Sequence, residues 1–144
     1  MSKNKKVAKS AVNKPDTKTV RTVEKTTDDK PVWRFSTTDK GGIFKWPKGQ
    51  NEELTIISKL HDFDSMSWNE ITGKQHHSLS DTGRLSKEAI DRLTELALDD
   101  EAENLFSFHL GGKPRFIAIK HGNIAKLFWY DPEHRVSPSL KKHT

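Results

Sequence analysis

The chain has 144 residues, with 25 Lys and Arg against 20 Asp and Glu and a formal net charge of +5. It contains no cysteine, which excludes disulfides, thiolate metal sites and cysteine nucleophiles. No apolar run approaches the about 20 residues of a membrane span, and no signal-peptide-like stretch follows the basic start, so we expect no membrane partner and a cytoplasmic location.

The excess charge is confined to the first thirty residues. Residues 1–30 carry nine bases and four acids (9 − 4 = +5), which leaves 16 of each sign in residues 31–144. The segment has no Leu, Ile, Phe, Trp or Tyr, so it lacks the apolar surface that would offset the entropy of ordering. We predict a disordered basic leader over 1–30, a single domain over 31–137 and a polar tail over 138–144.

The first predicted elements are a strand and a helix. β-branched and aromatic residues over 32–38 are typical of a strand, and Gly41-Gly42 of a turn. Acidic residues after Asn51 favour a helix start, because they complement the helix dipole. The spacing of the following apolar residues predicts one buried helix face, made by Leu54, Ile56, Ile57 and Leu60.

Two further helices are predicted from their caps. Ser67 and Glu70 fit a capping box that begins a short helical turn, and a polar loop follows over 72–84. Ser86 is suited to cap a helix over 87–98, with Leu85 and Ile90 as a hydrophobic staple. The buried face of this helix is predicted to contain Ile90, Leu93, Leu96 and Ala97.

From Leu105 the apolar period changes from 3.6 residues to two. Segments 105–110, 115–120 and 124–130 have the pattern of strands joined by glycine-containing turns, which predicts a three-stranded antiparallel meander. The order predicts an α+β fold: an N-terminal strand, two to three helices and then the meander, with the helices on one face of the sheet.

Charge within the predicted domain is uneven. Residues 31–50 carry +3 (four bases, one acid), 51–112 carry −8 (five bases, thirteen acids) and 113–144 carry +5 (seven bases, two acids). A basic sheet side beside an acidic helical layer can attract phosphates, although the same side chains can simply be solvated. The candidate RNA-binding residues are Lys113, Lys120, Lys126 and Arg135.

The candidate catalytic residues are Arg115, Tyr130 and His134. Cleavage of RNA by its own 2′-hydroxyl needs groups that move protons and a cation that neutralises the phosphate. The purely structural alternative is that Tyr130 is a core aromatic and that Arg115 pairs with Asp131 or Glu133. No phosphate-binding glycine loop or metal-ligand motif is present, and His76 and His77 are adjacent in a loop, so we expect no cofactor and no metal.

In its element order and basic meander, the segment 32–136 resembles the RelE/ParE-type toxins of bacterial toxin–antitoxin systems. The resemblance is nearest over 113–130 (KPRFIAIKHGNIAKLFWY), in a strand-opening arginine, a tight turn and an apolar last strand. The ending Asp-Pro-Glu-His at 131–134 is similar to that of small uncharacterised bacterial and mobile-element proteins. The resemblance implies a metal-independent endoribonuclease that cuts mRNA on the ribosome, and an antitoxin partner. It implies that Arg115 binds the scissile phosphate and that Tyr130 or His134 handles protons, assisted by Lys113 and Arg135.

The chain departs from that family in its long polar stretch between the first two helices and in its basic leader. We therefore carry three hypotheses forward. The leading one is a small RNA- or ribosome-binding protein of RelE-like fold that acts as a toxin endoribonuclease. The alternatives are a non-catalytic protein-interaction module that uses an exposed sheet edge and aromatics, and a simple nucleic-acid binder that uses leader and sheet.

Overall fold

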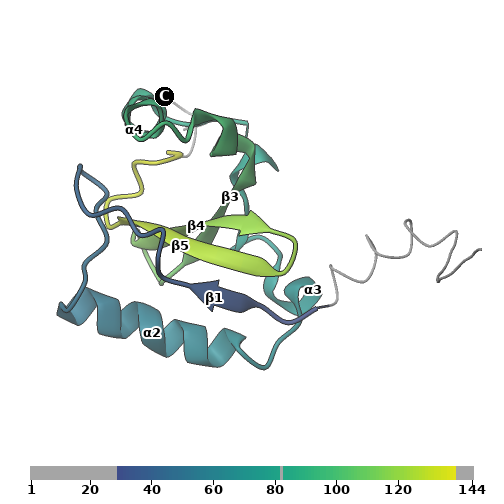
Figure 1. Cartoon of the computed structure of the whole chain (residues 1–144). Helices are drawn as coiled ribbons and strands as arrows, with labels where there is room; N and C mark the ends of the chain where they lie inside the picture. Colours follow the sequence, from purple (N-terminus) through teal and green to yellow (C-terminus); the bar gives the residue numbers. More distant parts are fainter. Residues whose placement is uncertain (1–28, 82, 139–144) are drawn as a thin grey trace, which may run out of the picture.

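A computed structural model describes residues 29–81 and 83–138, so most of the predicted leader and most of the predicted tail lie outside the described residues. The described chain forms one five-stranded sheet in the order β1-β5-β4-β3-β2 (Figure 1). The strands are β1 (Val32–Arg34), β2 (His77–Ser78), β3 (Leu105–His109), β4 (Arg115–His121) and β5 (Ile124–Asp131). β1 runs parallel to β5, and the other neighbours are antiparallel.

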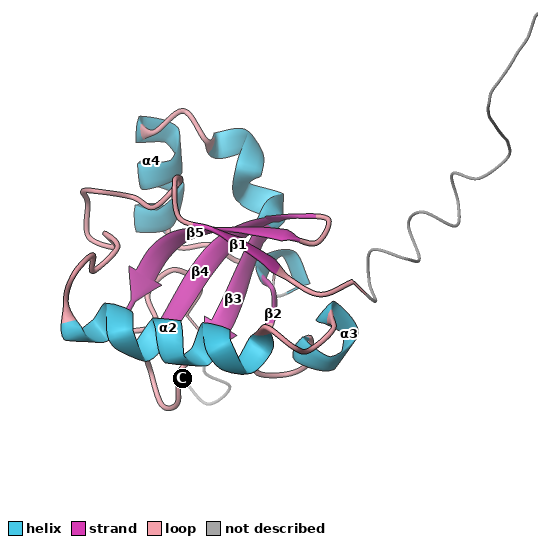
Figure 2. Cartoon of the chain, turned by 60° about the horizontal axis from the view of Figure 1, so that its bottom comes forward, coloured by secondary structure: helices cyan, strands magenta, loops and turns pink. Residues whose placement is uncertain are grey.

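The helices cover both faces of this sheet (Figure 2). They are α2 (Asn51–Phe63), α3 (Trp68–Ile71) and α4 (Lys87–Glu95), with short 3-10 helices at Leu79–Asp81 and Asp99–Asn104. α2 and α3 lie on one face, and α4 lies on the other. In the part of the chain that the structure describes, no helix has the length and apolar character needed to cross a membrane.

The mixed α+β class is confirmed, and two finer predictions are wrong. The sheet has a further strand, because His77–Ser78, in the predicted loop, pairs with β3. The helices do not share one face, because β4 and β5 carry apolar side chains on both faces and each face needs a cover. On β4, for example, Phe116 and Ala118 point towards α2, whereas Ile117 and Ile119 point towards α4.

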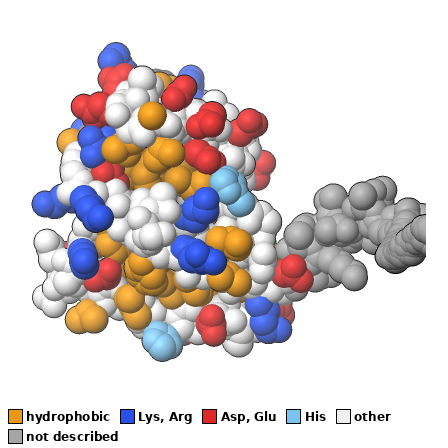
Figure 3. Space-filling view, in the orientation of Figure 1, with side chains coloured by type: hydrophobic (Ala, Val, Ile, Leu, Met, Phe, Trp, Pro, Cys, Tyr) orange, Lys and Arg blue, Asp and Glu red, His pale blue; other side chains and the backbone are white. Residues whose placement is uncertain are grey.

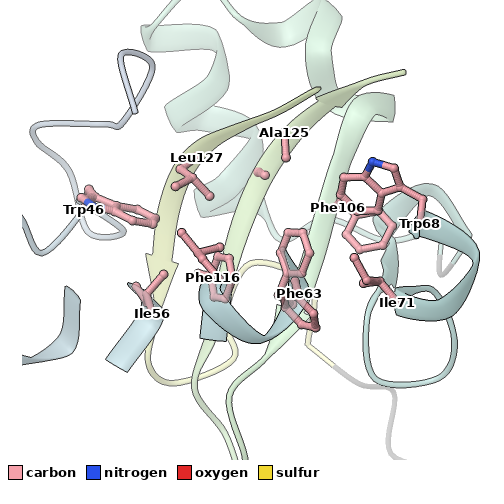
Figure 4. Packing of buried hydrophobic residues seen from close by; sticks show 12 residues of the cluster. Trp46, Ile56, Phe63, Trp68, Ile71, Phe106, Phe116, Ala125 and Leu127 are labelled. Atoms are coloured by element: carbon pink, nitrogen blue, oxygen red, sulfur yellow. The ribbon is translucent and has the colours of Figure 1, made fainter. Parts of the chain in front are cut away.

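The α2-side core joins α2 and α3 to the sheet. Figure 4 shows the side chains of both helices pointing towards those of the strands. Rings dominate it: Phe108 stacks on Phe116 at 4.6 Å between centroids, and Trp68 meets Phe106 edge-on at 5.3 Å. Its buried members are Trp46, Ile56, Leu60, Phe63, Trp68, Ile71, Phe106, Phe108, Phe116, Ala118, Ala125 and Leu127.

The α4-side core lies on the opposite face. It includes Phe128 and Trp129, two consecutive residues of β5 on the same side of the sheet. The register between β4 and β5 shifts at this point, because Ile117 is opposite Trp129 and Ala118 is opposite Leu127. The bulge therefore reverses the in–out alternation for the last residues of β5.

Both predicted serine caps are confirmed. Ser67 accepts a hydrogen bond from the Glu70 amide while Glu70 bonds back to the Ser67 amide, and Ser86 accepts one from Ala89. The predicted apolar faces are less accurate. On α2, Leu54 is 68% exposed and Phe63 is buried instead; on α4, the predicted staple residue Ile90 is 48% exposed.

α4 ends earlier than predicted, at Glu95. Ala97 takes a positive φ of 59°, a left-handed conformation that cannot continue a helix. The chain then turns into the 3-10 helix Asp99–Asn104, which leads directly into β3. The acidic stretch in this segment consequently lies directly before β3.

Candidate functional site

A pocket of about 490 Å³ lies on the α4-facing side of the sheet. Its walls are β2, β3, β4, the end of β5 and the segment after β5. Six of its lining side chains are cationic or can become so: Lys74, His77, Arg84, His109, Arg115 and His134. One carboxylate, that of Asp131, lines the same pocket.

Strand register brings the central side chains of this pocket together. His109 on β3 is directly opposite Arg115 on β4, and Arg115 is directly opposite Asp131 on β5. Paired residues of antiparallel neighbours point to the same face, with about 5 Å between their Cα atoms. The result is a row in which Arg115 lies between a histidine and a carboxylate. On the same face, His77 of β2 is opposite Ser107, the residue of β3 two positions before His109.

The Arg115 guanidinium is held by backbone oxygens of the preceding turn. Its Nη1 donates to the carbonyls of Gly112 at 3.2 Å and Lys113 at 3.0 Å. Burial lowers the Arg115 pKa and the Asp131 carboxylate opposes this effect, but the group stays charged near neutral pH. The site thus contains a fixed positive charge with donors still available to a ligand.

Asp131 shapes the turn that carries His134. Its side chain is 1% exposed and accepts two backbone hydrogen bonds, from Arg135 N at 2.7 Å and Val136 N at 2.9 Å. His134 takes a positive φ of 58° within this turn. Among the described residues, Arg115 forms no close ion pair with Glu133 or Asp131. Glu133 pairs with Lys113 at 3.3 Å, and Asp131, although it is opposite Arg115 and opposes the burial that lowers the Arg115 pKa, bonds to backbone.

Hydrogen bonds assign opposite tautomers to two pocket histidines. His77 Nδ1 is 3.1 Å from the Ser78 carbonyl and must donate, which leaves Nε2 of the neutral ring as a proton acceptor. His109 Nδ1 accepts from the Gly111 amide at 3.0 Å, so Nε2 of its neutral ring carries the proton. In the neutral state, His77 can therefore accept a proton at Nε2, and His109 can donate a hydrogen bond from Nε2.

The third histidine, His134, has a lowered pKa, and its neighbours act on it in both directions. Burial lowers its pKa below the usual value, and the neighbouring Arg115 charge lowers it further. The Asp131 carboxylate and a hydrogen bond to the Ser137 backbone work in the other direction. His109 also has a lowered pKa, through burial and then Arg115.

Of the predicted catalytic residues, the structure brings Arg115 and His134 together and places Tyr130 elsewhere. Tyr130 packs against the α2-side core, on the opposite face of the sheet. The reason is that alternation after the bulge turns Asp131, the next residue, into the pocket. Burial raises the Tyr130 pKa, with smaller contributions from Glu52 and Glu133.

The predicted RNA-binding residues do not converge. Lys113 and Arg135 pair with Glu133 at 3.3 Å and Glu88 at 3.0 Å. Lys120 lies 4.6 Å over the ring of Trp68, and Lys126 lies close enough to Glu101 to lower the pKa of that carboxyl group. Lys120 and Lys126 are thus at the end of the sheet away from the pocket.

Sequence reasoning missed His77, His109, Lys74 and Arg84. His109 was detectable: the strand pattern already puts it on the face opposite Phe106 and Phe108, and counting outward from the Gly111-Gly112 turn pairs it with Arg115. His77 gave no such signal, because a two-residue strand has no period. Among residues 29–81 and 83–138, no three His, Asp or Glu side chains are grouped to hold a metal ion.

Comparisons with known proteins found no matching family model, no matching curated protein and no matching solved structure. The geometry of the pocket and the sequence are therefore the basis for the functional argument.

Proposed function

We propose that the chain binds single-stranded RNA in the pocket around Arg115 and cleaves it as an endoribonuclease. The observation that carries this proposal is the row His109–Arg115–Asp131 with His77 and His134 in the same pocket. A guanidinium matches pairs of phosphate oxygens, and imidazoles exchange protons near neutral pH. Together these groups provide what phosphodiester cleavage requires.

The proposed reaction uses the RNA's own 2′-hydroxyl as nucleophile. His77 Nε2 takes the proton of the 2′-hydroxyl, and O2′ attacks phosphorus. The bond from phosphorus to O5′ breaks, and protonated His134 gives its proton to O5′. The products are a 2′,3′-cyclic phosphate and a 5′-hydroxyl end, so atoms and charges balance.

Arg115 and His109 act on the phosphate in this scheme. The Arg115 charge offsets the negative charge that builds up on the phosphate oxygens, and the His109 Nε2 proton adds a neutral donor. Asp131 acts through others: it holds the turn of His134 and favours the charged form of that ring.

The acid role of His134 predicts the pH dependence. Activity on the alkaline side falls as His134 loses its proton, and its pKa is below the ordinary value of 6.5. The rate should therefore be highest in mildly acid solution and decline through neutrality. A rate that rises steadily from about pH 6 to pH 8 would contradict this assignment.

We also propose, on the resemblance of residues 113–130, a relationship to RelE/ParE-type toxins. It would make mRNA on the ribosome the substrate, the cytoplasm the site of action and an antitoxin the partner. The positions of Arg115 and His134 support this proposal, whereas Tyr130 has no part in it.

A test of the proposed function compares variants of the purified protein on a labelled RNA. Arg115→Ala and His134→Ala should each lower the cleavage rate by about 10²-fold or more, the scale of losing one charge-stabilising or proton-transfer group. Tyr130→Phe is the matched control and should cleave like the wild type. Equal rates in all four proteins, or no cleavage by the wild type, would refute the proposal that the protein is an endoribonuclease.

The runner-up function is a non-catalytic protein-interaction module. It is favoured by β1, an edge strand of the sheet whose Val32 side chain is 41% exposed, beside the exposed Phe35. Under this function, expression in a host should leave growth and RNA unaffected, and Arg115→Ala should change neither. Growth arrest that Arg115→Ala abolishes would reject it.

A further inference from the structure

A second pocket, of about 590 Å³, lies between the segment after β1 and the start of α2. Its lining includes Phe35, Lys40, Lys45, Trp46, Lys48 and Glu53. Figure 3 shows Lys and Arg side chains spread across the middle of the face that carries this segment, with hydrophobic side chains above and below. The pocket shares no lining residue with the pocket around Arg115.

The segment that forms this pocket is held firmly to the rest of the fold. The buried Asp39 carboxylate accepts hydrogen bonds from Arg92 Nε at 2.9 Å and Nη2 at 2.7 Å, and from Trp129 Nε1 at 2.9 Å. Gly42, at φ +78°, permits this contact, since a Cβ there would be 2.7 Å from Arg92 Nε. The pocket is thus largely pre-formed, which limits the entropy cost of binding.

Positive charge predominates in this pocket. The Asp39 carboxylate is neutralised by Arg92, so three lysines face the single remaining carboxylate of Glu53, a balance of 3 − 1 = +2. Glu53 is itself engaged, accepting from Trp46 Nε1 at 2.7 Å and Gly49 N at 2.8 Å. None of Lys40, Lys45 and Lys48 forms an ion pair with another described residue.

An aromatic ring lies among these lysines. Phe35 is 42% exposed and rests edge-on against the buried Trp46, with 6.3 Å between ring centroids. Exposed rings interleaved with cations are the usual platform for single-stranded nucleic acid, because any base can stack and the backbone follows the charges. An acidic peptide would use the lysines but would gain little from the Phe35 ring.

The two pockets lie on either side of the end of β5. The segment that forms the second pocket bonds to β5, through Asp39 N to Phe128 O and Tyr130 N to Phe44 O, both at 2.9 Å. The next residue, Asp131, lines the pocket around Arg115. A nucleic-acid strand bound in one pocket would therefore lie close to the other pocket.

We propose that the second pocket is a binding subsite for single-stranded RNA outside the cleaved bond, in which a base stacks on Phe35 and phosphates contact Lys40, Lys45 and Lys48. This inference rests on the proposed function and specifies which part of the RNA the protein holds besides the scissile phosphate.

The experiment measures binding alone, with a fluorescently labelled 2′-O-methyl oligonucleotide of about 12 nucleotides, a typical length for such sites. Because the 2′-hydroxyl is blocked, the strand binds without being cut. The variants are Phe35→Ala and the triple variant Lys40→Gln, Lys45→Gln, Lys48→Gln. The matched controls, on the exposed surface of α4, are Ile90→Ala and Lys87→Gln, and thermal unfolding establishes that each protein is folded.

Phe35→Ala should weaken binding roughly five- to 150-fold, the effect of losing one base–aromatic stack. The triple variant should reduce the slope of log K against log salt by about 2, or about 0.7 for each phosphate that a lysine no longer neutralises. Both controls should bind like the wild type. If the variants also bind like the wild type, the subsite is refuted while cleavage through Arg115 stands; if the wild type binds no RNA at all, the proposed function fails first.

Discussion

The buried histidine His76 should make the stability of this fold depend steeply on acid. Its ring is 9% exposed, packs edge-on against Phe63 at 4.9 Å, and accepts a hydrogen bond at Nδ1 from the His109 amide at 3.0 Å. Burial lowers its pKa from 6.5 to about 4, with smaller contributions from Lys59, His109 and His77. A protonated ring would place a charge among apolar side chains and would lose the acceptor nitrogen that bonds to the His109 amide.

The size of the effect follows from the shift in pKa. The unfolded chain takes up a proton at His76 near pH 6.5, whereas the folded chain does so only near pH 4. The contribution of this residue to stability is thus complete above pH 6.5 and is lost as the pH falls through about 4. A difference of about 2.5 pKa units corresponds to about 3 kcal/mol.

Urea unfolding at a series of pH values measures this contribution. His76→Gln is the informative variant, because its amide oxygen can accept a hydrogen bond and does not titrate. Between about pH 7 and pH 4, the wild type should lose about 3 kcal/mol more stability than the variant. Contributions from His109 and His134 are present in both proteins and cancel. Parallel pH curves for the two proteins would refute the reasoning.

Three further predictions concern the packing that positions the pockets, each measured as the free energy of unfolding in urea. Asp39→Asn should cost about 3 kcal/mol, because it leaves the Arg92 charge without its buried partner; an unchanged free energy of unfolding would contradict this role of Asp39. Phe108→Ala should cost about 4 kcal/mol, because this fully buried ring contacts several others; a loss below about 1 kcal/mol would mean that the core collapses around the gap. Ser67→Ala should cost about 1 kcal/mol because the helix cap is removed, and no change would contradict that role.

Local chemistry was predictable where neighbouring residues decide the structure. The serine caps at Ser67 and Ser86 and the helix start at Asn51 follow from hydrogen bonds and dipoles within a few residues. The α+β class follows from the change of period at Leu105. That Arg115 and His134 belong to the same end of the β4–β5 hairpin follows from the predicted meander, because Arg115 begins β4 and His134 follows the end of its antiparallel neighbour β5.

The predictions that were wrong concern features that depend on packing between distant parts of the chain. The sequence favours Tyr130 as a site residue because it ends the last strand and because of the family resemblance. The bulge at Phe128 and Trp129 reverses the alternation of β5, nothing in that apolar run marks it, and Asp131 occupies the pocket face instead. The burial of Phe63 in place of Leu54 depends on how α2 lies on the sheet. Strand β2 forms because β3 offers it an edge, which no two-residue pattern can reveal.

We propose that RNA is cleaved in the pocket around Arg115 by means of its own 2′-hydroxyl. The most direct measurement uses a DNA strand that contains a single ribonucleotide and determines the mass of the products. We expect one cut, directly after that ribonucleotide, with a 2′,3′-cyclic phosphate on one fragment and a 5′-hydroxyl on the other, and no cut with Arg115→Ala. Cleavage at deoxyribonucleotides, products with a 5′-phosphate, or an intact strand would contradict it.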